Sequence, residues 1–369
     1  MQSIEIIGVG PCAMPDELLA FTGPPCPVEV RDARDSPKAL LERLAAGAWL
    51  AIEGPYAYVD AIYRYCQHNE RALVSPEDFA HIPERPARRA AMVETRRRKL
   101  HHLLVVARDD GLPHIEEAPE LAGLQDWLLE SPGERPFLIP VRRLQRILVD
   151  MRRAREGVRV PGLARPLAIL PHVYVPWDGT VPAMFAEYGS LMDGKRVLDI
   201  GAATGVLALL AAEFGAARVV ATDSNPRAVE NARVNVERFG LAAKIDVRPP
   251  ADMFEAVGDE EFDVILFNAP WAEGEPQTLY DTAIYDPERQ VLGKFLAGAE
   301  QRLAPDGVVL LQLSDVSSRA GGESLEFVRE LVEANGLRIA GSRHIVRESR
   351  LIRTREKVYV FEIRRNNQQ

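Results

Sequence analysis

From residue 195 onward, short apolar segments alternate with segments of helical periodicity. Parallel strands need a crossover between them, usually a helix, so this alternation predicts a doubly wound α/β sheet. A final pair of apolar segments, separated by a short polar stretch, is expected to add an antiparallel end and bring the sheet to seven strands. The expected strands are residues 196–200, 218–222, 244–248, 262–267, 307–313, 337–346 and 356–363, and the expected helices are 206–214, 225–239, 286–302 and 322–335.

The preceding part of the chain has a different pattern, in which several predicted helices begin at proline and shorter apolar segments lie between them. It predicts a mixed α+β domain over residues 1–156 that serves as a substrate-recognition or cap domain. Residues 157–180 are rich in proline and glycine and are expected to form a connector, with a hairpin as one option. Residues 181–369 then form the catalytic domain. In the first domain, helices are expected at 36–46, 55–67, 86–99, 119–130 and 140–156, and strands at 3–9, 49–53, 100–108 and 137–139.

A turn of small residues joins the first strand of the predicted sheet to its helix. It runs from Asp199 through Gly201, Ala202, Ala203 and Thr204 to Gly205. Such a turn lets a ligand approach the backbone, and its composition also suits a dinucleotide. However, Ala203 replaces the middle glycine of the dinucleotide pattern, and a carboxylate at Asp199 would repel a pyrophosphate but attract a cation. We therefore expect a cationic cofactor, with a dinucleotide-binding oxidoreductase as the alternative.

Two further acids follow the next strands. Asp223, followed by Ser224, ends the second strand, where a carboxylate can accept hydrogen bonds from ribose hydroxyls. Asp252, next to Met253, follows the third strand and is expected to reach an adenine amino group. The alternatives are that Asp223 caps the next helix and that Asp252 is a solvated loop acid.

The tetrapeptide Asn268-Ala269-Pro270-Trp271 closes the fourth strand. The lone pair of a planar amide or guanidine nitrogen is delocalised, so this nitrogen must be held in place to attack. The side-chain oxygen of Asn268 and the carbonyl of Ala269 can each accept an N–H bond, and Trp271 can stack on the planar group. The tetrapeptide therefore predicts a site for a nitrogen nucleophile.

With these motifs, residues 171–314 resemble the class I S-adenosylmethionine-dependent methyltransferases that carry an Asn-Pro-Pro-Tyr/Trp-type motif, in particular the protein-glutamine methyltransferases that act on release factors. The segment Tyr174-Val175-Pro176-Trp177-Asp178-Gly179-Thr180 is similar to the proline-rich stretch that precedes their catalytic domain. The resemblance implies a Rossmann-like fold, S-adenosylmethionine as cofactor and methylation of nitrogen. Ala269 departs from the family, which usually has proline there, and the first domain is longer than the family's helical one.

The acceptor is the least constrained part of the prediction. Four acids that follow the tetrapeptide, Glu273, Glu275, Asp281 and Asp286, fall in one loop with Tyr280 and Tyr285 and suit a cationic planar group, with a solvated loop as the alternative. A small metabolite or amino acid, with the guanidinium of arginine as one candidate, is therefore the preferred acceptor. A glutamine side chain in a protein and, less favoured, a nucleic acid are the alternatives, as is a cofactor-binding module without catalysis. The expected substrate-binding residues are Tyr174, Thr180, Trp271, Glu273, Glu275, Tyr280 and Tyr285.

Several classes of function are disfavoured by composition. Cys12, Cys26 and Cys66 are odd in number and far apart, and adjacent His101 and His102 would point to opposite sides of a strand, so neither a disulfide framework nor a metal site is expected. A net charge of -9 gives no overall attraction to nucleic acid. Without an apolar segment of membrane-spanning length or a secretion signal, a cytoplasmic location is expected. The sequence leaves the oligomeric state open.

Overall fold

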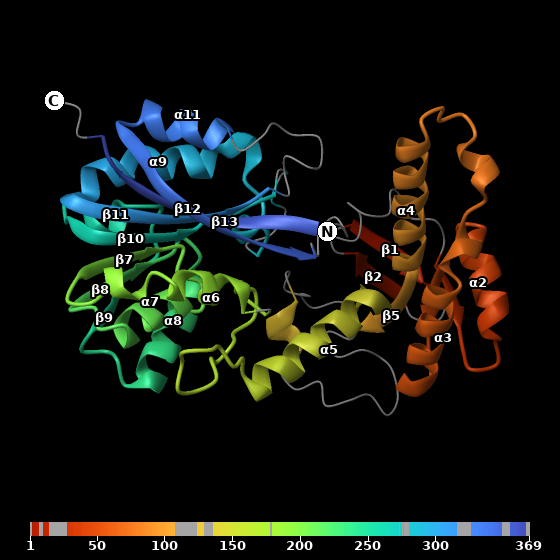
Figure 1. Ribbon diagram of the computed structural model, residues 1–369. Helices are drawn as coiled ribbons and strands as arrows, with labels where there is room; N and C mark the ends of the chain where they lie inside the picture. Colours follow the sequence, from red (N-terminus) through yellow and green to blue (C-terminus); the bar gives the residue numbers. More distant parts are fainter. Residues whose placement is uncertain are drawn as a thin grey trace. The chain divides into compact units, whose positions relative to one another are not determined.

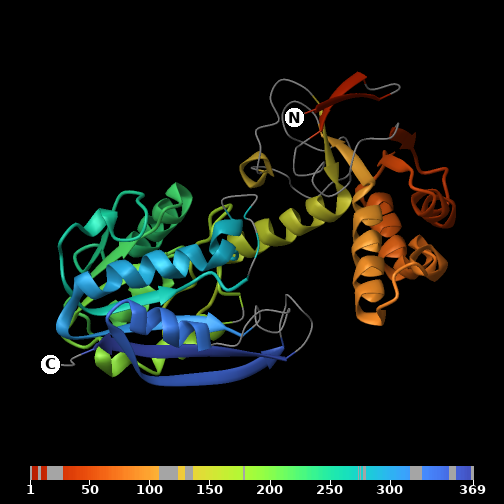
Figure 2. The ribbon, with the colours of Figure 1, turned by 90° about the horizontal axis from the view of Figure 1, so that it is seen from above.

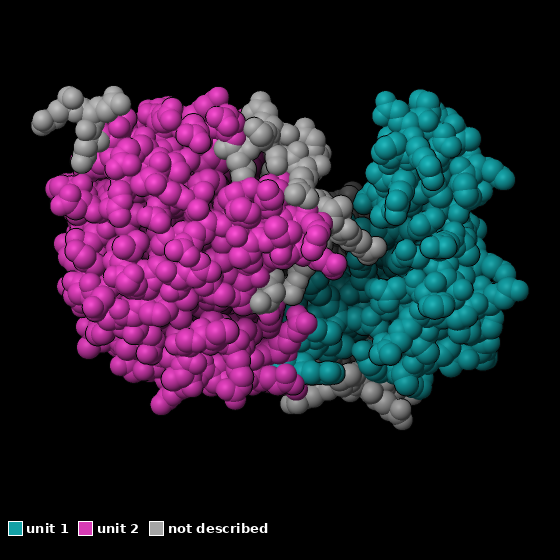
Figure 3. Space-filling model, viewed as in Figure 1, with its two compact units in different colours: residues 1–152 teal, residues 153–369 magenta. Residues whose placement is uncertain are grey.

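The computed structural model describes residues 2–6, 10–14, 28–107, 124–128, 136–177, 179–272, 274, 276, 280–315, 326–348 and 355–366. The chain divides into two compact units, residues 1–152 and 153–369 (Figure 3). The division falls inside helix α5 (Val141–Glu156), near the boundary expected at residue 156.

The first unit is built on a six-stranded mixed sheet, as its predicted α+β class requires. Its strands are β1 (Gln2–Ile6), β2 (Gly10–Met14), β3 (Val28–Arg31), β4 (Trp49–Ile52), β5 (Leu103–Ala107) and β6 (Phe137–Pro140), in the spatial order β1-β2-β6-β5-β4-β3. β3, β4 and β5 are parallel, whereas β6 runs antiparallel to β5. Because β4 and β5 are buried along their whole length, side chains on both faces of the sheet contribute to hydrophobic clusters.

The helices of this unit are α2 (Pro37–Ala45), α3 (Tyr56–His68), α4 (Arg85–His101) and α5, with 3₁₀ turns η1 (Glu70–Leu73), η2 (Pro76–Phe79) and η3 (Leu124–Trp127). Apolar residues of α2, α3 and α5 pack with β4, β5 and β6 in one cluster. The side chain of Ser36 accepts a hydrogen bond from the Ala39 N–H and so caps α2.

The expected secondary structure of the first unit needs three corrections. β2 and β3 were not expected. Of the expected helix 119–130, residues 124–127 form the short η3, and residues 119–123 and 129–130 lie outside the described residues. α4 continues to His101, past the point where a strand was expected, so the two histidines lie at a helix end rather than on a strand. His102 stacks on Trp49 with ring centroids 4.6 Å apart, and burial lowers its pKa to about 4. His102 is therefore a neutral core residue.

The second unit contains a seven-stranded sheet, which confirms the predicted doubly wound, mostly parallel fold. Its strands are β7 (Arg196–Ile200), β8 (Arg218–Thr222), β9 (Ile245–Val247), β10 (Phe262–Asn268), β11 (Leu303–Ser314), β12 (Leu337–Glu348) and β13 (Arg355–Arg365), in the order β12-β13-β11-β10-β7-β8-β9. β7 to β11 are parallel, and β13 pairs antiparallel with both β11 and β12. The antiparallel end therefore lies where the sequence predicted it.

Helices cover both faces of this sheet. α6 (Thr180–Ala186), α7 (Val206–Glu213) and α8 (Pro226–Phe239) lie on one side, and α9 (Gln290–Arg302) and α11 (Glu326–Ala334) lie on the other (Figure 1). In the view from above, α9 and α11 again run over the strands (Figure 2). Short 3₁₀ turns complete the unit, at η4 (Gly189–Leu191), η5 (Glu255–Val257), η6 (Asp281–Ala283) and η7 (Pro287–Arg289). No helix among the described residues is long and apolar enough to cross a membrane.

The strand order fixes where a ligand can bind. The chain leaves β7 toward β8 on one side, whereas β10 pairs with β7 on the other side, so the order reverses between β7 and β10. In open α/β sheets, ligands bind outside the carboxyl ends of the strands at such a point. Asp199 on β7, Asp223 after β8 and Asn268 at the end of β10 lie at these carboxyl ends.

Candidate functional site

The turn after β7 has a backbone that only small residues tolerate easily. Gly201, Ala203 and Gly205 have φ values of 67°, 49° and 78°, all in the left-handed region. A Cβ atom on Gly205 would also lie 3.3 Å from Cα of Ala232 on α8, so a larger residue would strain both the turn and the helix packing. The turn therefore brings exposed Gly201 to the sheet edge without side-chain bulk, which suits a ligand lying against the backbone.

Asp199 provides a buried carboxyl group beneath this turn. Its Oδ2 atom accepts a hydrogen bond of 2.9 Å from the Ala208 N–H, and its Oδ1 atom has no hydrogen-bond partner among the described residues. Burial raises the pKa of Asp199 to about 8, with a smaller contribution from Asp223. A buried acid with one unused oxygen fits a cationic ligand, because a positive charge would compensate for burial of the carboxylate.

Asp223 connects the turn to the next helix. Its Oδ2 atom accepts a 2.9 Å bond from the Ala203 N–H, and its Oδ1 atom accepts a 2.8 Å bond from the Asn225 N–H. Asn225 is itself the N-cap of α8 and accepts from the Arg227 N–H. Asp223 thus holds the small-residue turn in place, and the backbone N–H of Ser224 is a further donor to it. A carboxylate has about four lone-pair sites, so the group can still accept a bond from a ribose hydroxyl. Ser224 is exposed next to it.

The loop after β9 lies against the same edge. The Ala251 N–H donates to the carbonyl of Asp223 at 3.2 Å. This bond brings the next two residues, Asp252 and Met253, near Asp223. Asp252 is half-exposed and pairs with Lys294 at 3.2 Å. Met253 has a φ of 43° and packs against the core. The predicted contact of Asp252 with an adenine amino group stays a prediction.

Asn268 places an amide at the end of β10. Its Oδ1 atom is buried and has no hydrogen-bond partner among the described residues, while Ala269 is 1% exposed. Asn268 pairs in register with Gln312 of β11, whose Nε2 atom donates to Sδ of Met184 on α6 at 3.3 Å. A buried acceptor oxygen without a donor is costly. A ligand N–H would satisfy it, as the tetrapeptide predicted.

The loop after Trp271 is held by backbone hydrogen bonds. The N–H groups of Trp271 and Ala272 both donate to the carbonyl of Ile284, at 3.1 and 2.9 Å. Gly274 lies against the ring of Tyr285, where a Cβ atom would be 2.9 Å from Cδ1. The tetrapeptide is thus tied to the segment that carries the two predicted tyrosines, of which Tyr280 precedes η6. Glu273 and Glu275 lie outside the described residues.

Asp286 has a structural role, although the sequence grouped it with the loop acids. It is 6% exposed, and its two oxygens accept bonds from the N–H groups of Val291 and Leu292 at 2.8 and 3.1 Å. It therefore caps α9, which begins at Gln290 rather than at residue 286 as expected.

Known proteins of one family are similar to this chain in sequence. Residues 183–318 match the model of the methyltransferase small domain. The chain is 31% identical to a "putative protein N5-glutamine methyltransferase" from Methanocaldococcus jannaschii, in an alignment that covers 41% of this chain and 77% of that protein. The chain belongs to the S-adenosylmethionine-dependent methyltransferases. It is an enzyme of this class, with S-adenosylmethionine as its cofactor, which confirms the resemblance drawn from the turn and the tetrapeptide.

Other relatives match shorter shares of their length. The chain is 30% identical to a release factor glutamine methyltransferase from Cereibacter sphaeroides over 56% of this chain and 65% of that protein. It is 41% identical to a ribosomal protein L11 methyltransferase from Aeromonas hydrophila over 20% of this chain, and it spans about 25% of that relative's length. It also aligns with the solved ribosomal protein L11 methylase of Lactobacillus delbrueckii subsp. bulgaricus at 19% identity, covering 55% of this chain and 86% of that one with a TM-score of 0.40.

Two asparagines of α8, Asn231 and Asn235, and its N-cap Asn225 bind the connector to the methyltransferase fold, and sequence reasoning missed them. Asn235 accepts from the Ala168 N–H at 2.7 Å, and its Nδ2 donates to the carbonyl of Thr204 in the turn after β7 at 2.9 Å. Asn231 makes the equivalent pair of bonds with Ala168 and Leu170, and Asn225 donates to His172. Asparagine recurring on one side of a helix was the available signal, since α8 would otherwise bury apolar residues there.

The connector itself pairs with its own chain through an antiparallel bridge between Val158 and Leu167, in keeping with the hairpin option. Of the two substrate residues predicted in it, Tyr174 lies between buried Val173 and Val175, and Thr180 opens α6 after Gly179, whose φ is 68°. Both are partly exposed. Their contact with an acceptor stays a prediction.

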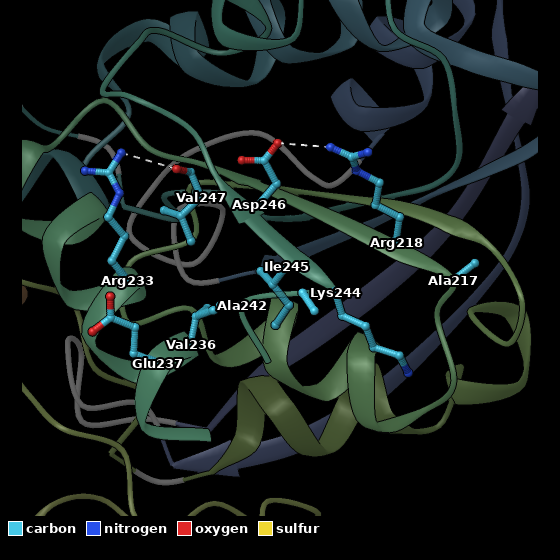
Figure 4. A pocket seen from close by; sticks show the side chains of 11 residues that line it. Ala217, Arg218, Arg233, Val236, Glu237, Ala242, Lys244, Ile245, Asp246 and Val247 are labelled. Atoms are coloured by element: carbon cyan, nitrogen blue, oxygen red, sulfur yellow. Dashed lines mark hydrogen bonds and ion pairs between the residues drawn. The ribbon is translucent and has the colours of Figure 1, made fainter. Parts of the chain in front are cut away.

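A surface cavity of about 440 Å³ lies elsewhere, against α8 and β9 (Figure 4). Its walls include Arg218 and Lys244, at the amino ends of the strands, whereas the turn of small residues after β7 lies at the carboxyl ends. Arg218 pairs with Asp246 at 3.2 Å, and Arg233 donates to the carbonyl of Val247 at 3.2 Å. Because these two arginines are already engaged within the fold, the cavity is not the candidate site.

Proposed function

We propose that this methyltransferase transfers a methyl group to the side-chain amide nitrogen of a glutamine in a protein. The proposal rests on the buried, unsatisfied Oδ1 atom of Asn268 at the switch point of the sheet. The names of the relatives support it, because two of them are described as glutamine methyltransferases acting on a release factor or on protein N5-glutamine.

The residues around the switch point have complementary tasks in this proposal. S-adenosylmethionine supplies an electrophilic methyl group on a sulfonium. Asp199 offers its free oxygen to the cofactor's positive charge, and Asp223 offers its remaining lone pairs to ribose hydroxyls. Oδ1 of Asn268 and the carbonyl of Ala269 accept the two N–H bonds of the glutamine amide, so the nitrogen lone pair points toward the methyl carbon. As the new N–C bond formed, the bond between the methyl carbon and the sulfonium sulfur would break, S-adenosylhomocysteine would be the leaving group, and the nitrogen would then lose a proton to water.

A protein acceptor replaces the small metabolite that the sequence favoured. That preference depended on loop acids, and of these Glu273 and Glu275 lie outside the described residues, whereas Asp286 caps α9. The relatives' names support a protein amide instead. The first unit then has the task of recognising the protein that carries the glutamine.

Mass spectrometry of candidate protein substrates tests the proposal. The purified enzyme is incubated with S-adenosylmethionine and either a peptide release factor or ribosomal protein uL3, the substrate named for a further relative that is 33% identical. We expect one methyl group on a glutamine side chain, located by fragmentation, and methylation that is slower by about a hundredfold or more with Asn268→Ala. Methylation confined to RNA or to added arginine would overturn the proposed acceptor while leaving the methyltransferase assignment intact.

A further inference from the structure

The ring of Trp271 carries an arginine on one face. The guanidinium carbon of Arg347, on β12, lies 5.1 Å from the centroid of the Trp271 ring. Trp271 is the last residue of the tetrapeptide that begins with Asn268, so this arginine stands beside the proposed acceptor site although it is distant in sequence. A cation over an indole face is attracted by the electron density of the ring.

Buried hydrogen bonds hold Arg347 in this position. Its Nε atom donates to Oε1 of Glu356 at 2.7 Å, and these residues are register partners on β12 and β13. The side chain of Glu356 is 2% exposed, and its other oxygen, Oε2, accepts a 2.9 Å bond from the Ser314 hydroxyl. Moving Arg347 away would leave a buried carboxylate without its counter-charge, which is costly. The arginine is therefore held in place rather than freely mobile.

A second arginine on the same strand provides a contrast. Arg343 is four residues earlier on β12 and so faces the same side; it lies 5.8 Å from the ring of Tyr188 and pairs with Glu187 at 3.1 Å. Its side chain is 64% exposed and that of Glu187 is 47% exposed, compared with 20% and 2% for Arg347 and Glu356. Exposed pairs of this kind contribute little to stability. Of these two pairs, the one next to Trp271 is the more buried.

We propose that Arg347 is a positioning residue that fixes the Trp271 ring and makes the acceptor site selective for a neutral planar group over a guanidinium. The proposal rests on the function proposed above, since it assumes that the acceptor lies beside Asn268 and Trp271. Arg347 places a fixed positive charge at the ring, which repels a second cation. Glu356 is not open to an incoming guanidinium, because its side chain is 2% exposed and its two oxygens are held by Arg347 and Ser314. A neutral amide meets neither obstacle.

The test uses two small probes of nearly equal shape, N-acetylcitrulline amide, which is neutral, and N-acetylarginine amide, which is a cation. The full-length protein is labelled with 5-fluorotryptophan and saturated with S-adenosylhomocysteine, and Trp271→Phe assigns the fluorine resonance of Trp271. We expect the citrulline probe to shift this resonance and the arginine probe to leave it unchanged. In Arg347→Met, the resonance itself should move or broaden, and the affinity for the arginine probe should rise by about threefold or more.

Three further variants complete the test. Arg347→Lys keeps the charge and should still reject the arginine probe, while Arg343→Met, the matched control on the same strand, should behave as the wild type. If Arg347→Met does not fold, the double variant Arg347→Met/Glu356→Gln removes both charges and should accept the arginine probe.

Equal responses to both probes in the wild type, no response to the citrulline probe, or an unchanged Trp271 resonance in Arg347→Met would each overturn the inference. The readout needs no methyl transfer. A negative glutamine assay would therefore contradict the proposed function separately.

Discussion

At the scale of single residues, Asp199 links cofactor binding to pH. Its pKa is raised from 3.8 to about 8 in the folded protein, chiefly by burial, so between these values the native state holds a proton that the unfolded chain has released. The contribution of Asp199 to stability is therefore present below pH 3.8 and is lost as the pH rises toward 8.

The corresponding prediction concerns the neutral variant Asp199→Asn without cofactor. Relative to wild type, its melting temperature should rise progressively between about pH 4 and pH 8 and level off above that, as measured in a series of buffers. S-adenosylmethionine should stabilise the wild type much more than the variant, because the variant lacks the carboxylate. A difference in melting temperature that does not change with pH would contradict this account.

Asn268 gives a second prediction at this scale. Replacing it with alanine removes the side-chain oxygen that holds the acceptor nitrogen, and kcat should fall by about a hundredfold or more, as for other single hydrogen bonds to a reacting group. Single-turnover methylation together with calorimetry of S-adenosylhomocysteine separates the two steps. Weaker cofactor binding with unchanged single-turnover chemistry would assign Asn268 to the cofactor alone.

At the scale of elements, α8 is bonded both to the connector and to the turn after β7, and two of its asparagines allow a matched comparison. Asn231→Ala and Asn235→Ala each remove bonds to the connector, and each should lower the free energy of unfolding by about 1–3 kcal/mol in urea titrations. Only Asn235 also bonds Thr204 in the turn, so only Asn235→Ala should weaken cofactor binding. Equal cofactor affinity in the two variants would show that the Thr204 bond does not support the turn.

The periodicity of apolar residues predicted the bounds of some strands and helices but not of others. The observed bounds of β7 and β8 are the predicted ones, because each is a buried apolar segment bounded by polar residues. β2 contains glycine and proline, which have low strand propensity, and it is a strand through its pairing with β1 and β6. α4 runs into residues expected to form a strand because nothing in Lys99-Leu100-His101 ends a helix.

At the scale of the whole molecule, the two units allow binding and recognition to be separated. A fragment of residues 141–369 keeps α5 and the entire second unit, including the contact between Arg153 and the ring of Trp177 at 4.8 Å. We expect it to bind S-adenosylhomocysteine with the affinity of the full chain, because the turn, Asp199 and Asp223 all lie within it. Methylation of a protein substrate should be lost if the first unit recognises that substrate. Full activity of the fragment would rule out this role.

The sequence by itself determined the seven-stranded sheet, the turn of small residues after β7 and the tetrapeptide, since these depend on local periodicity, small residues and strand ends. The class of cofactor followed from Asp199 at a strand end, from Ala203 in place of a glycine and from the tetrapeptide. Only the tertiary structure decided which polar groups are already used: Asp286 caps a helix, Glu356 is enclosed by Arg347 and Ser314, and Oδ1 of Asn268 is left without a partner among the described residues. Hydrogen-bond satisfaction depends on residues far apart in the chain, and a local pattern does not contain it.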